Sequence, residues 1–234
     1  MGRGVAVISF PGSNGDHDAL YAFRDAVGVP AELVDYRVTN LDRFDAVVLP
    51  GGFAYGDYLR CGAIARFAPV MDPLRAFAER GGPVLGICNG FQVLIEAHLL
   101  PGALLMNQSL NFHSSWVDLR VESVSTVWTA SLAEGEVLSF PVAHGGGKYF
   151  ADPDVLDRVE GNGQVIFRYC DPDGQLSDDA NFNGSLNAIA GICNERRNVV
   201  GLMPHPERAS DPLLGPTDGL RMLTAVASFL SVAT

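Results

Sequence analysis

Continuous apolar runs alternate with helical patterns through the first half of the chain. Apolar runs without alternation indicate strands buried on both faces, and they occupy residues 5–10, 31–34, 45–49 and 84–87. Apolar residues spaced three and four apart predict helices over residues 16–27, 70–80 and 91–97. Strands that alternate with helices predict an α/β protein with a parallel, doubly wound sheet.

The second half of the chain has a different pattern. Val117, Leu119 and Val121 alternate with polar residues, which is typical of a half-exposed antiparallel strand. Further apolar runs predict strands over residues 137–143, 165–169, 187–192 and 199–203, and a closing amphipathic helix is expected over residues 220–230. Residues 171–184 are polar and predict an exposed loop, and we find no repeat or clear linker. We therefore expect one domain, residues 1–234, with a mixed, mostly parallel central sheet flanked by helices.

A cysteine directly follows the apolar run at residues 84–87. Gly86 and Gly90 flank Cys88 at two residues on either side, and a helical pattern starts at once. This is the layout of a nucleophile elbow, in which a sharp turn between strand and helix exposes the nucleophile and aims backbone N–H groups at developing charge. The alternative is a small buried cysteine beside a tight turn, and a five-residue pattern does not decide between the two.

A pair of glycines ends the predicted strand at residues 45–49. Gly51 and Gly52, followed by Phe53, would stand at the carboxyl end of a parallel strand, where ligands bind in open α/β sheets. Their backbone N–H groups are free to face an oxyanion. A plain turn is the alternative, since Gly-Gly commonly marks a loop.

A histidine and a glutamate follow the predicted strand at residues 199–203. Proline after His205 favours extended backbone there, which would direct His205 and Glu207 to the same side. A carboxylate beside an imidazole fixes its tautomer and stabilises its charged form. A surface histidine with a chance acidic neighbour is the alternative. His144, in a glycine-rich turn, is open to a binding role, whereas Cys61 and the remaining histidines have no such motif and are interpreted as structural or surface residues.

Composition narrows the classes of function. The chain has 234 residues, of which 47% are hydrophobic, and its formal net charge is −11, so a nucleic-acid partner is not expected. The four cysteines form no C-x-x-C pair, which leaves a metal site without support. No signal peptide and no apolar stretch of about 18–20 residues is present, so we expect no membrane segment and a cytoplasmic location.

Together these motifs resemble a known family. Gly86-Ile-Cys-Asn-Gly-Phe-Gln92 with His205-Pro-Glu207 is similar to the class I, or triad, glutamine amidotransferases. More narrowly, residues 10–14, 51–65, 99–104 and 201–208 resemble the glutaminase subunits of phosphoribosylformylglycinamidine synthase. The resemblance covers nearly the whole chain and implies a flavodoxin-like, single-domain amidotransferase fold.

The resemblance also assigns roles by position. It implies that Cys88 is the nucleophile, His205 the acid and base, and Glu207 the residue that orients His205. Oxyanion N–H groups are expected from Gly52 or Phe53 and from Asn89. Substrate contacts are expected from Gln92 and from the segment at residues 107–112, namely Asn107, Ser109 and Phe112.

Three positions depart from the pattern of this family. An acid is expected where Gly146 stands, glycine where His98 stands, and an acid or cysteine at Gly15. None of these belongs to the implied triad. Gly146 leaves any role for an acid at that position in doubt.

The implied reaction is hydrolysis of L-glutamine to glutamate and ammonia through a cysteine thioester. Ammonia would pass to a large synthetase subunit, accompanied by a small third subunit, for ATP-dependent conversion of formylglycinamide ribonucleotide to the amidine in purine biosynthesis. No ATP motif occurs in this chain, so no cofactor is expected here, and ATP and Mg²⁺ are expected on the partner. A stand-alone γ-glutamyl hydrolase and a non-catalytic regulatory subunit are the alternatives.

Overall fold

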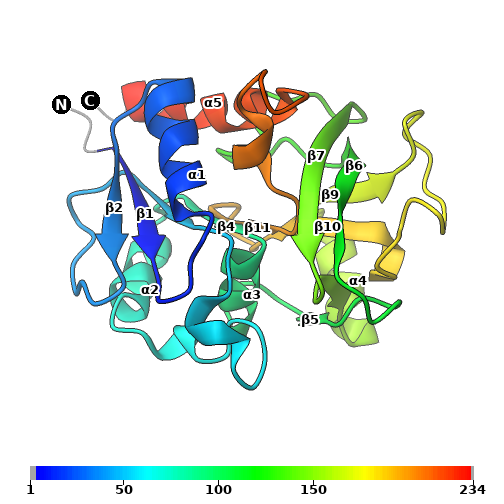
Figure 1. Cartoon of the computed structure of the whole chain (residues 1–234), viewed down its shortest axis with the longest axis horizontal. Helices are drawn as coiled ribbons and strands as arrows, with labels where there is room; N and C mark the ends of the chain where they lie inside the picture. The colour runs from blue at the N-terminus through cyan, green and yellow to red at the C-terminus, as the bar shows by residue number, and fades with distance from the viewer. Residues whose placement is uncertain (1–3, 233–234) are drawn as a thin grey trace.

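A nine-stranded sheet forms the centre of the molecule (Figure 1). The computed structural model describes residues 4–232. The strand order is β2-β1-β3-β4-β11-β10-β9-β6-β7, and a separate two-stranded sheet pairs β5 with β8. The strands are β1 (Val5–Ser9), β2 (Ala31–Asp35), β3 (Ala46–Leu49), β4 (Val84–Ile87), β5 (Ala103–Leu105), β6 (His113–Val121), β7 (Val137–His144), β8 (Lys148–Phe150), β9 (Val165–Cys170), β10 (Ile189–Cys193) and β11 (Val199–Leu202).

Five neighbouring strands, from β2 to β11, run parallel. Residues of β1, β3 and β4 are almost all fully buried, which explains why these strands read as continuous apolar runs. In the register of this half, Leu49 lies opposite Gly86, and Leu202 lies opposite Ile87. The segments that follow β3, β4 and β11 therefore leave the sheet side by side at one edge.

The other half of the sheet, from β11 to β7, is antiparallel. Burial alternates strictly along β7, with Leu138, Phe140, Val142 and His144 facing inward. This is the pattern of a sheet with one buried and one more exposed face. The predicted mixed, mostly parallel α/β sheet is confirmed, whereas a single domain over residues 1–234 stays a prediction, since residues 1–3 and 233–234 lie outside the described part.

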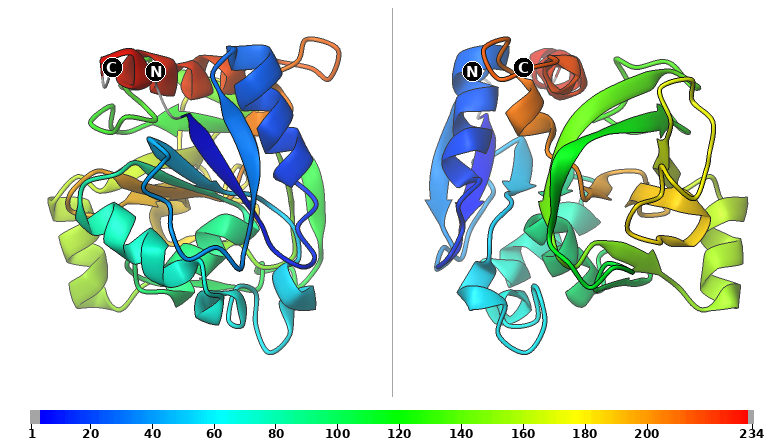
Figure 2. Two further views of the ribbon diagram at one scale, coloured as in Figure 1. Left: turned by 90° about the vertical axis from the view of Figure 1, so that its left-hand side faces the viewer. Right: turned by 45° about the vertical axis from the view of Figure 1, so that its right-hand side comes forward.

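Helices cover both faces of the sheet (Figures 1 and 2). The helix α1 (Asp16–Tyr21) continues directly into a π-helical segment η1 (Ala22–Val27), and the closing helix α5 (Asp218–Val232) lies with them on one side. On the other side lie α2 (Met71–Glu79) and α3 (Asn89–Glu96). Glycine at Gly219 lets α5 approach the backbone of Pro206, because a Cβ there would overlap the Pro206 carbonyl.

One helix and two strands have no counterpart in the sequence prediction. The helix α4 (Pro153–Gly161) begins with proline in its first turn, a favoured position, but only Val159 of it is buried. The strands β5 and β8 are only three residues long. Such short or exposed elements lack the repeated apolar positions from which periodicity is recognised.

The helix α3 ends in a left-handed residue. The N–H of His98 donates to Ile95 and the N–H of Leu99 donates to Leu94, both at 2.9 Å, which is the Schellman arrangement. His98 has φ +57°, a conformation that glycine adopts without strain. This geometry explains why the resembled family is expected to carry glycine where this chain has His98.

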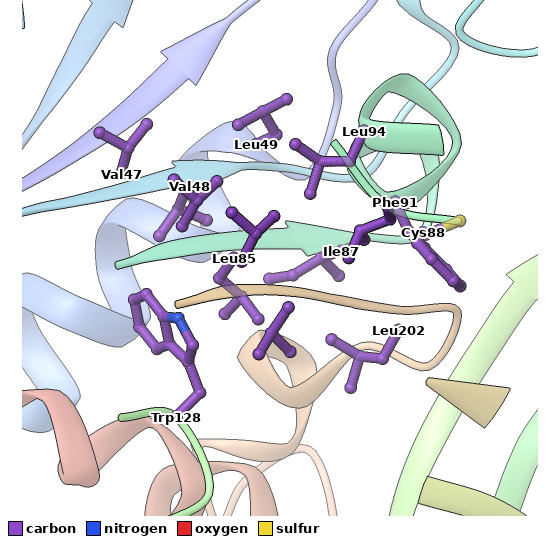
Figure 3. Packing of buried hydrophobic residues seen from close by; sticks show 14 of the residues in the cluster. Val47, Val48, Leu49, Leu85, Ile87, Cys88, Phe91, Leu94, Trp128 and Leu202 are labelled. Atoms are coloured by element: carbon purple, nitrogen blue, oxygen red, sulfur yellow. The ribbon is translucent and has the colours of Figure 1, made fainter. Parts of the chain in front are cut away.

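Apolar side chains fill the space on both faces of the parallel strands. Figure 3 shows Leu49 and Leu94 on one side of β4 and Leu202 and Trp128 on the other, with the sulfur of Cys88 at the end of β4. These four leucine and tryptophan side chains are fully buried. No helix within residues 4–232 has the length and apolar character needed to cross a membrane.

Candidate active site

Cys88 occupies a strained turn between β4 and α3. Its backbone has φ +50° and ψ −105°, an unusual conformation for a residue with a side chain, and its N–H donates to Leu202 at 2.8 Å. Gly90 carries no Cβ because one would overlap the Leu49 carbonyl, and a Cβ at Gly86 would lie 2.8 Å from Gly90. The two glycines therefore allow strand, turn and helix to approach closely, as the nucleophile-elbow interpretation requires.

His205 and Glu207 form a buried pair. The Nδ1 atom of His205 lies 2.6 Å from Glu207 Oε1, and both side chains are almost completely buried. The sequence predicts their adjacency from extended backbone, but the structure achieves it differently. Residues Pro206–Ala209 form a short 3-10 turn (η5), and His205 precedes it with φ −107° and ψ 86°. The turn brings the carboxylate back onto the ring.

Gly51 brings the elbow and the histidine together. A Cβ at Gly51 would lie 2.7 Å from His205 Cε1 and 3.6 Å from Cys88 Cβ, so any side chain here would displace the ring from Cys88. The strand β7 supports both groups: Pro141 accepts the N–H of His205 at 2.8 Å, and the Cys88 thiol donates to Ala143 at 3.9 Å. Cys88, His205 and Glu207 thus form one cluster at the carboxyl ends of β4 and β11.

The electrostatics of the cluster favour a charged imidazole. Burial alone would lower the pKa of His205, but the Glu207 carboxylate and an ionised Cys88 raise that pKa to about 10. The Nε2 atom of His205 is buried and has no hydrogen-bond partner among residues 4–232. With Nδ1 held by Glu207, Nε2 is the atom left for proton transfer.

The two N–H groups expected to bind the oxyanion after β3 differ in their bonding. The N–H of Phe53 donates to Gly12 at 2.9 Å, which favours Gly52 over Phe53 as the oxyanion donor, and a role of either residue stays a prediction. The N–H of Gly52 has no acceptor within the described residues. Gly52 has φ +145°, and a Cβ would crowd Ser13 and Asn14, which pair with this segment.

The first turn of α3 supplies the other donor. The N–H of Asn89 precedes the first helical hydrogen bond, which runs from Gln92 to Cys88 at 3.1 Å, and so it remains free to bind an anion. The Gln92 side chain is buried and bonded within the chain: its Oε1 accepts from Asn89 at 2.9 Å, and its Nε2 donates to Gly146 at 2.5 Å. A direct contact of Gln92 with substrate stays a prediction.

The Asn107 side chain forms hydrogen bonds to the turn after β7. Its Nδ2 donates to the carbonyl groups of His144 and Asn111, at 2.8 and 3.0 Å, and its Oδ1 accepts from Gly147 and from the His144 ring, at 3.2 and 3.0 Å. Every polar atom of this fully buried side chain is therefore bonded inside the protein. These bonds favour a role in holding the turn after β7, and a direct substrate contact by Asn107 stays a prediction.

Ser109 and Phe112 lie on the exposed loop that follows β5. Phe112 and the neighbouring Met106 approach Gly145, since a Cβ there would lie 3.9 and 3.7 Å from them. Ser109 accepts the N–H of Asn111 at 3.3 Å and faces solvent. Of this pair the structure brings only Phe112 beside the turn next to the nucleophile.

Gly146 has room for a side chain. A Cβ at this position would meet Gln92, Leu105 and Met106 at an ordinary 3.7 Å. The backbone here therefore does not require glycine, although the family pattern leads us to expect an acid. The carbonyl of Gly146 accepts the hydrogen bond from the Gln92 side chain. No side-chain motif in the sequence indicates this backbone contact.

The geometry and the family comparison agree on the class of protein. Residues 3–219 match the CobB/CobQ-like glutamine amidotransferase domain. A solved glutamine amidotransferase from Thermotoga maritima, 16% identical, shares the fold with a TM-score of 0.61, covering 97% of this chain and 96% of that one.

More similar proteins narrow the assignment. Phosphoribosylformylglycinamidine synthase subunit PurQ of Thermomicrobium roseum is 60% identical over 95% of this chain and 94% of its own length. The same subunit of Rubrobacter xylanophilus is 60% identical over 95% and 96%. A solved structure of PurLQS from Thermotoga maritima includes a chain 42% identical, with a TM-score of 0.85 and coverage of 97% and 98%. The chain therefore belongs to the PurQ family of glutamine amidotransferases.

Proposed function

We propose that this chain is the glutaminase subunit of phosphoribosylformylglycinamidine synthase, with Cys88 as nucleophile, His205 as acid and base, and Glu207 as the residue that orients His205. The observation that carries the proposal is the meeting of a strained cysteine elbow with a buried His–Glu pair across Gly51. The PurQ relatives support the substrate and the product.

Acylation begins at Cys88. Its thiolate, beside the charged His205, attacks the side-chain carbonyl carbon of L-glutamine. The resulting oxyanion is held by the N–H groups of Gly52 and Asn89, whose positions are fixed before substrate arrives. His205 Nε2 then protonates the amide nitrogen, the C–N bond breaks, and ammonia leaves a γ-glutamyl thioester on Cys88.

Deacylation uses the same groups in reverse roles. His205, now neutral, takes a proton from water as the water oxygen attacks the thioester. The tetrahedral oxyanion again faces Gly52 and Asn89. Collapse breaks the C–S bond and releases glutamate, and the proton held by His205 restores the starting state. Glu207 keeps the ring oriented and stabilises its charged form throughout.

The ammonia is consumed by a partner. We assign the ATP-dependent step, with ATP and Mg²⁺, to a large synthetase subunit that works with a small third subunit, and we place no cofactor on this chain. The PurLQS structure supports such an assembly. A cytoplasmic location, where a reduced Cys88 persists, accords with the four free cysteines.

The test uses the assembled complex with Cys88→Ala. Glutamine-driven synthesis of the amidine should be lost, whereas ammonium salts should still drive the reaction at the wild-type rate, because the synthetase is untouched. Retention of the glutamine-driven rate would overturn the role of Cys88. Loss of both rates would show that the substitution acts on assembly, contrary to the proposal.

A further inference from the structure

The side chain of Asn89 joins the two halves of the oxyanion site. It is almost fully buried, and its Oδ1 accepts the N–H of Ala54 at 3.0 Å. Its Nδ2 donates to Asp57 Oδ1 at 3.1 Å and to Gln92 at 2.9 Å. Ala54 and Asp57 belong to the short 3-10 segment η2 (Ala54–Asp57), which begins two residues after Gly52. One side chain thus ties the segment of Gly52 to the first turn of α3.

Asp57 is held in this position against its backbone preference. It has φ +54°, and the neighbouring Tyr55, Gly56 and Leu59 have φ +54°, +70° and +69°. Non-glycine residues keep such conformations only where surrounding contacts determine them. For Asp57 those contacts are hydrogen bonds from Cys61 and Asn89 to its carboxylate. Burial raises the pKa of the Asp57 carboxyl, and these two hydrogen bonds to the ionised form oppose that rise.

We propose that Asp57 is a positioning residue for the oxyanion site of this enzyme. It acts through Asn89 and contacts no reacting atom. By fixing the Asn89 amide, its carboxylate sets the distance between the N–H of Asn89 and the N–H of Gly52. This proposal rests on the proposed glutaminase function.

The expected consequence is on turnover more than on binding. The oxyanion exists only in the transition state and the tetrahedral intermediate, so misplaced donors weaken those states and leave bound glutamine largely unaffected. A residue that served only to anchor the loop would change stability without changing turnover. The ratio of the effects on kcat and KM therefore separates the two roles.

Two substitutions distinguish the effect of losing the Asp57 hydrogen bond from the effect of changing the backbone conformation. Asp57→Gly keeps the left-handed conformation available and removes the acceptor. Asp57→Asn keeps both, since asparagine tolerates positive φ and carries an acceptor oxygen at the same position. In the complex, Asp57→Gly should lower kcat for glutamine by roughly 10- to 100-fold with KM changed by less than about threefold. Asp57→Asn should stay within about threefold of wild type, and the ammonia-driven rate should be unchanged in both variants.

Several results would overturn the proposal: an unaffected kcat in Asp57→Gly, an equal loss in Asp57→Asn, or a parallel loss of the ammonia-driven rate. The Cys88→Ala complex is measured alongside. If that complex keeps its glutamine-driven rate, the proposed function fails and the role of Asp57 fails with it. If it loses that rate while Asp57→Gly does not, the role of Asp57 alone fails.

Discussion

Two buried histidines near Cys88 differ in the side chain that contacts Nδ1, and this difference contributes to the difference in their charge. His144 ends β7 and His205 follows β11, and each presents Nδ1 to an oxygen while its Nε2 has no partner among the described residues. The oxygen belongs to the neutral amide of Asn107 in one case and to the carboxylate of Glu207 in the other. Burial and the charge of His205 lower the pKa of His144 to about 3, whereas Glu207 and Cys88 overcome burial and raise that of His205 to about 10.

The same type of side chain is neutral at one position of the site and charged at the other, according to its surroundings. Asn107 already donates through Nδ2 to two carbonyl groups, so its Oδ1 must accept from His144, which places a proton on Nδ1 of that ring. Burial lowers the pKa of His144 and so favours a neutral ring with no proton on Nε2. Glu207 instead favours a charged ring with a proton on Nε2 as well. In the proposed mechanism the acid that releases ammonia is therefore His205 and not His144.

The largest expected effect separates the two histidines directly. His→Asn keeps a donor near the position of Nδ1 and removes Nε2 at either site. His205→Asn should lower the glutamine-driven rate of the complex by roughly 10²- to 10⁴-fold, the usual contribution of a general acid and base. His144→Asn should cost less than about tenfold, because its ring carries no transferable proton. Steady-state rates of the two variants check this, and equal losses would contradict the distinction.

A smaller effect is expected when only the charge of the neighbour is removed. Glu207→Gln should return the pKa of His205 toward that of a buried neutral ring and lower the glutamine-driven rate by roughly 10- to 100-fold, since Nε2 remains in place. The pH–rate profile of the variant, measured beside wild type, should show the loss of the charged form at lower pH. An unchanged profile would mean that Glu207 does not set the charge of His205.

Stability should depend on pH in opposite directions at the two sites. His205 has a folded pKa of about 10, above the ordinary 6.5, so its contribution is complete below pH 6.5 and is lost as pH rises toward 10. His144 has a folded pKa of about 3, so its contribution is present above pH 6.5 and is lost as pH falls toward 3. Each should be on the order of a few kcal/mol in the free energy of unfolding. Denaturant titrations of the His→Asn variants across pH should each remove one of these dependences.

An exposed histidine provides the smallest effect and a useful contrast. His98 is exposed, and it occupies the left-handed position just after α3. His98→Gly should stabilise the protein by up to about 1 kcal/mol, since relief of strain exceeds the added freedom of the unfolded chain. Thermal unfolding checks the sign. A loss of stability would mean that the His98 side chain makes a compensating contact.

The sequence predicts the parts of the site that follow from strand ends. Cys88 directly follows an apolar run and His205 comes two residues after another, and parallel strands bring such positions to one edge of the sheet, so their meeting is predictable. The adjacency of His205 and Glu207 is predicted as well, although a 3-10 turn produces it instead of extended chain. In these cases two or three neighbouring residues carry the information.

The remaining contacts join residues far apart in the chain, through loops without periodic patterns. The bonds of Asn107 to the turn after β7, of Phe53 to Gly12, and of Asp57 to Asn89 depend on where loops meet once the sheet has formed. Backbone groups such as the carbonyl of Gly146 carry no residue-specific signal at all. For this reason the sequence does not reveal that the N–H of Phe53 is occupied or that Asn107 is fully bonded inside the protein.

One of the two buried rings, His205, is expected to be charged and the other, His144, neutral, and ¹⁵N NMR of histidine-labelled protein distinguishes these forms. The chain has only five histidines, so single His→Asn variants assign the signals. At about pH 8 the signals of His205 should be those of an imidazolium, while His144 should remain neutral, with its proton on Nδ1, down to about pH 5. A neutral His205 at about pH 8, or a charged His144 at about pH 5, would contradict the account.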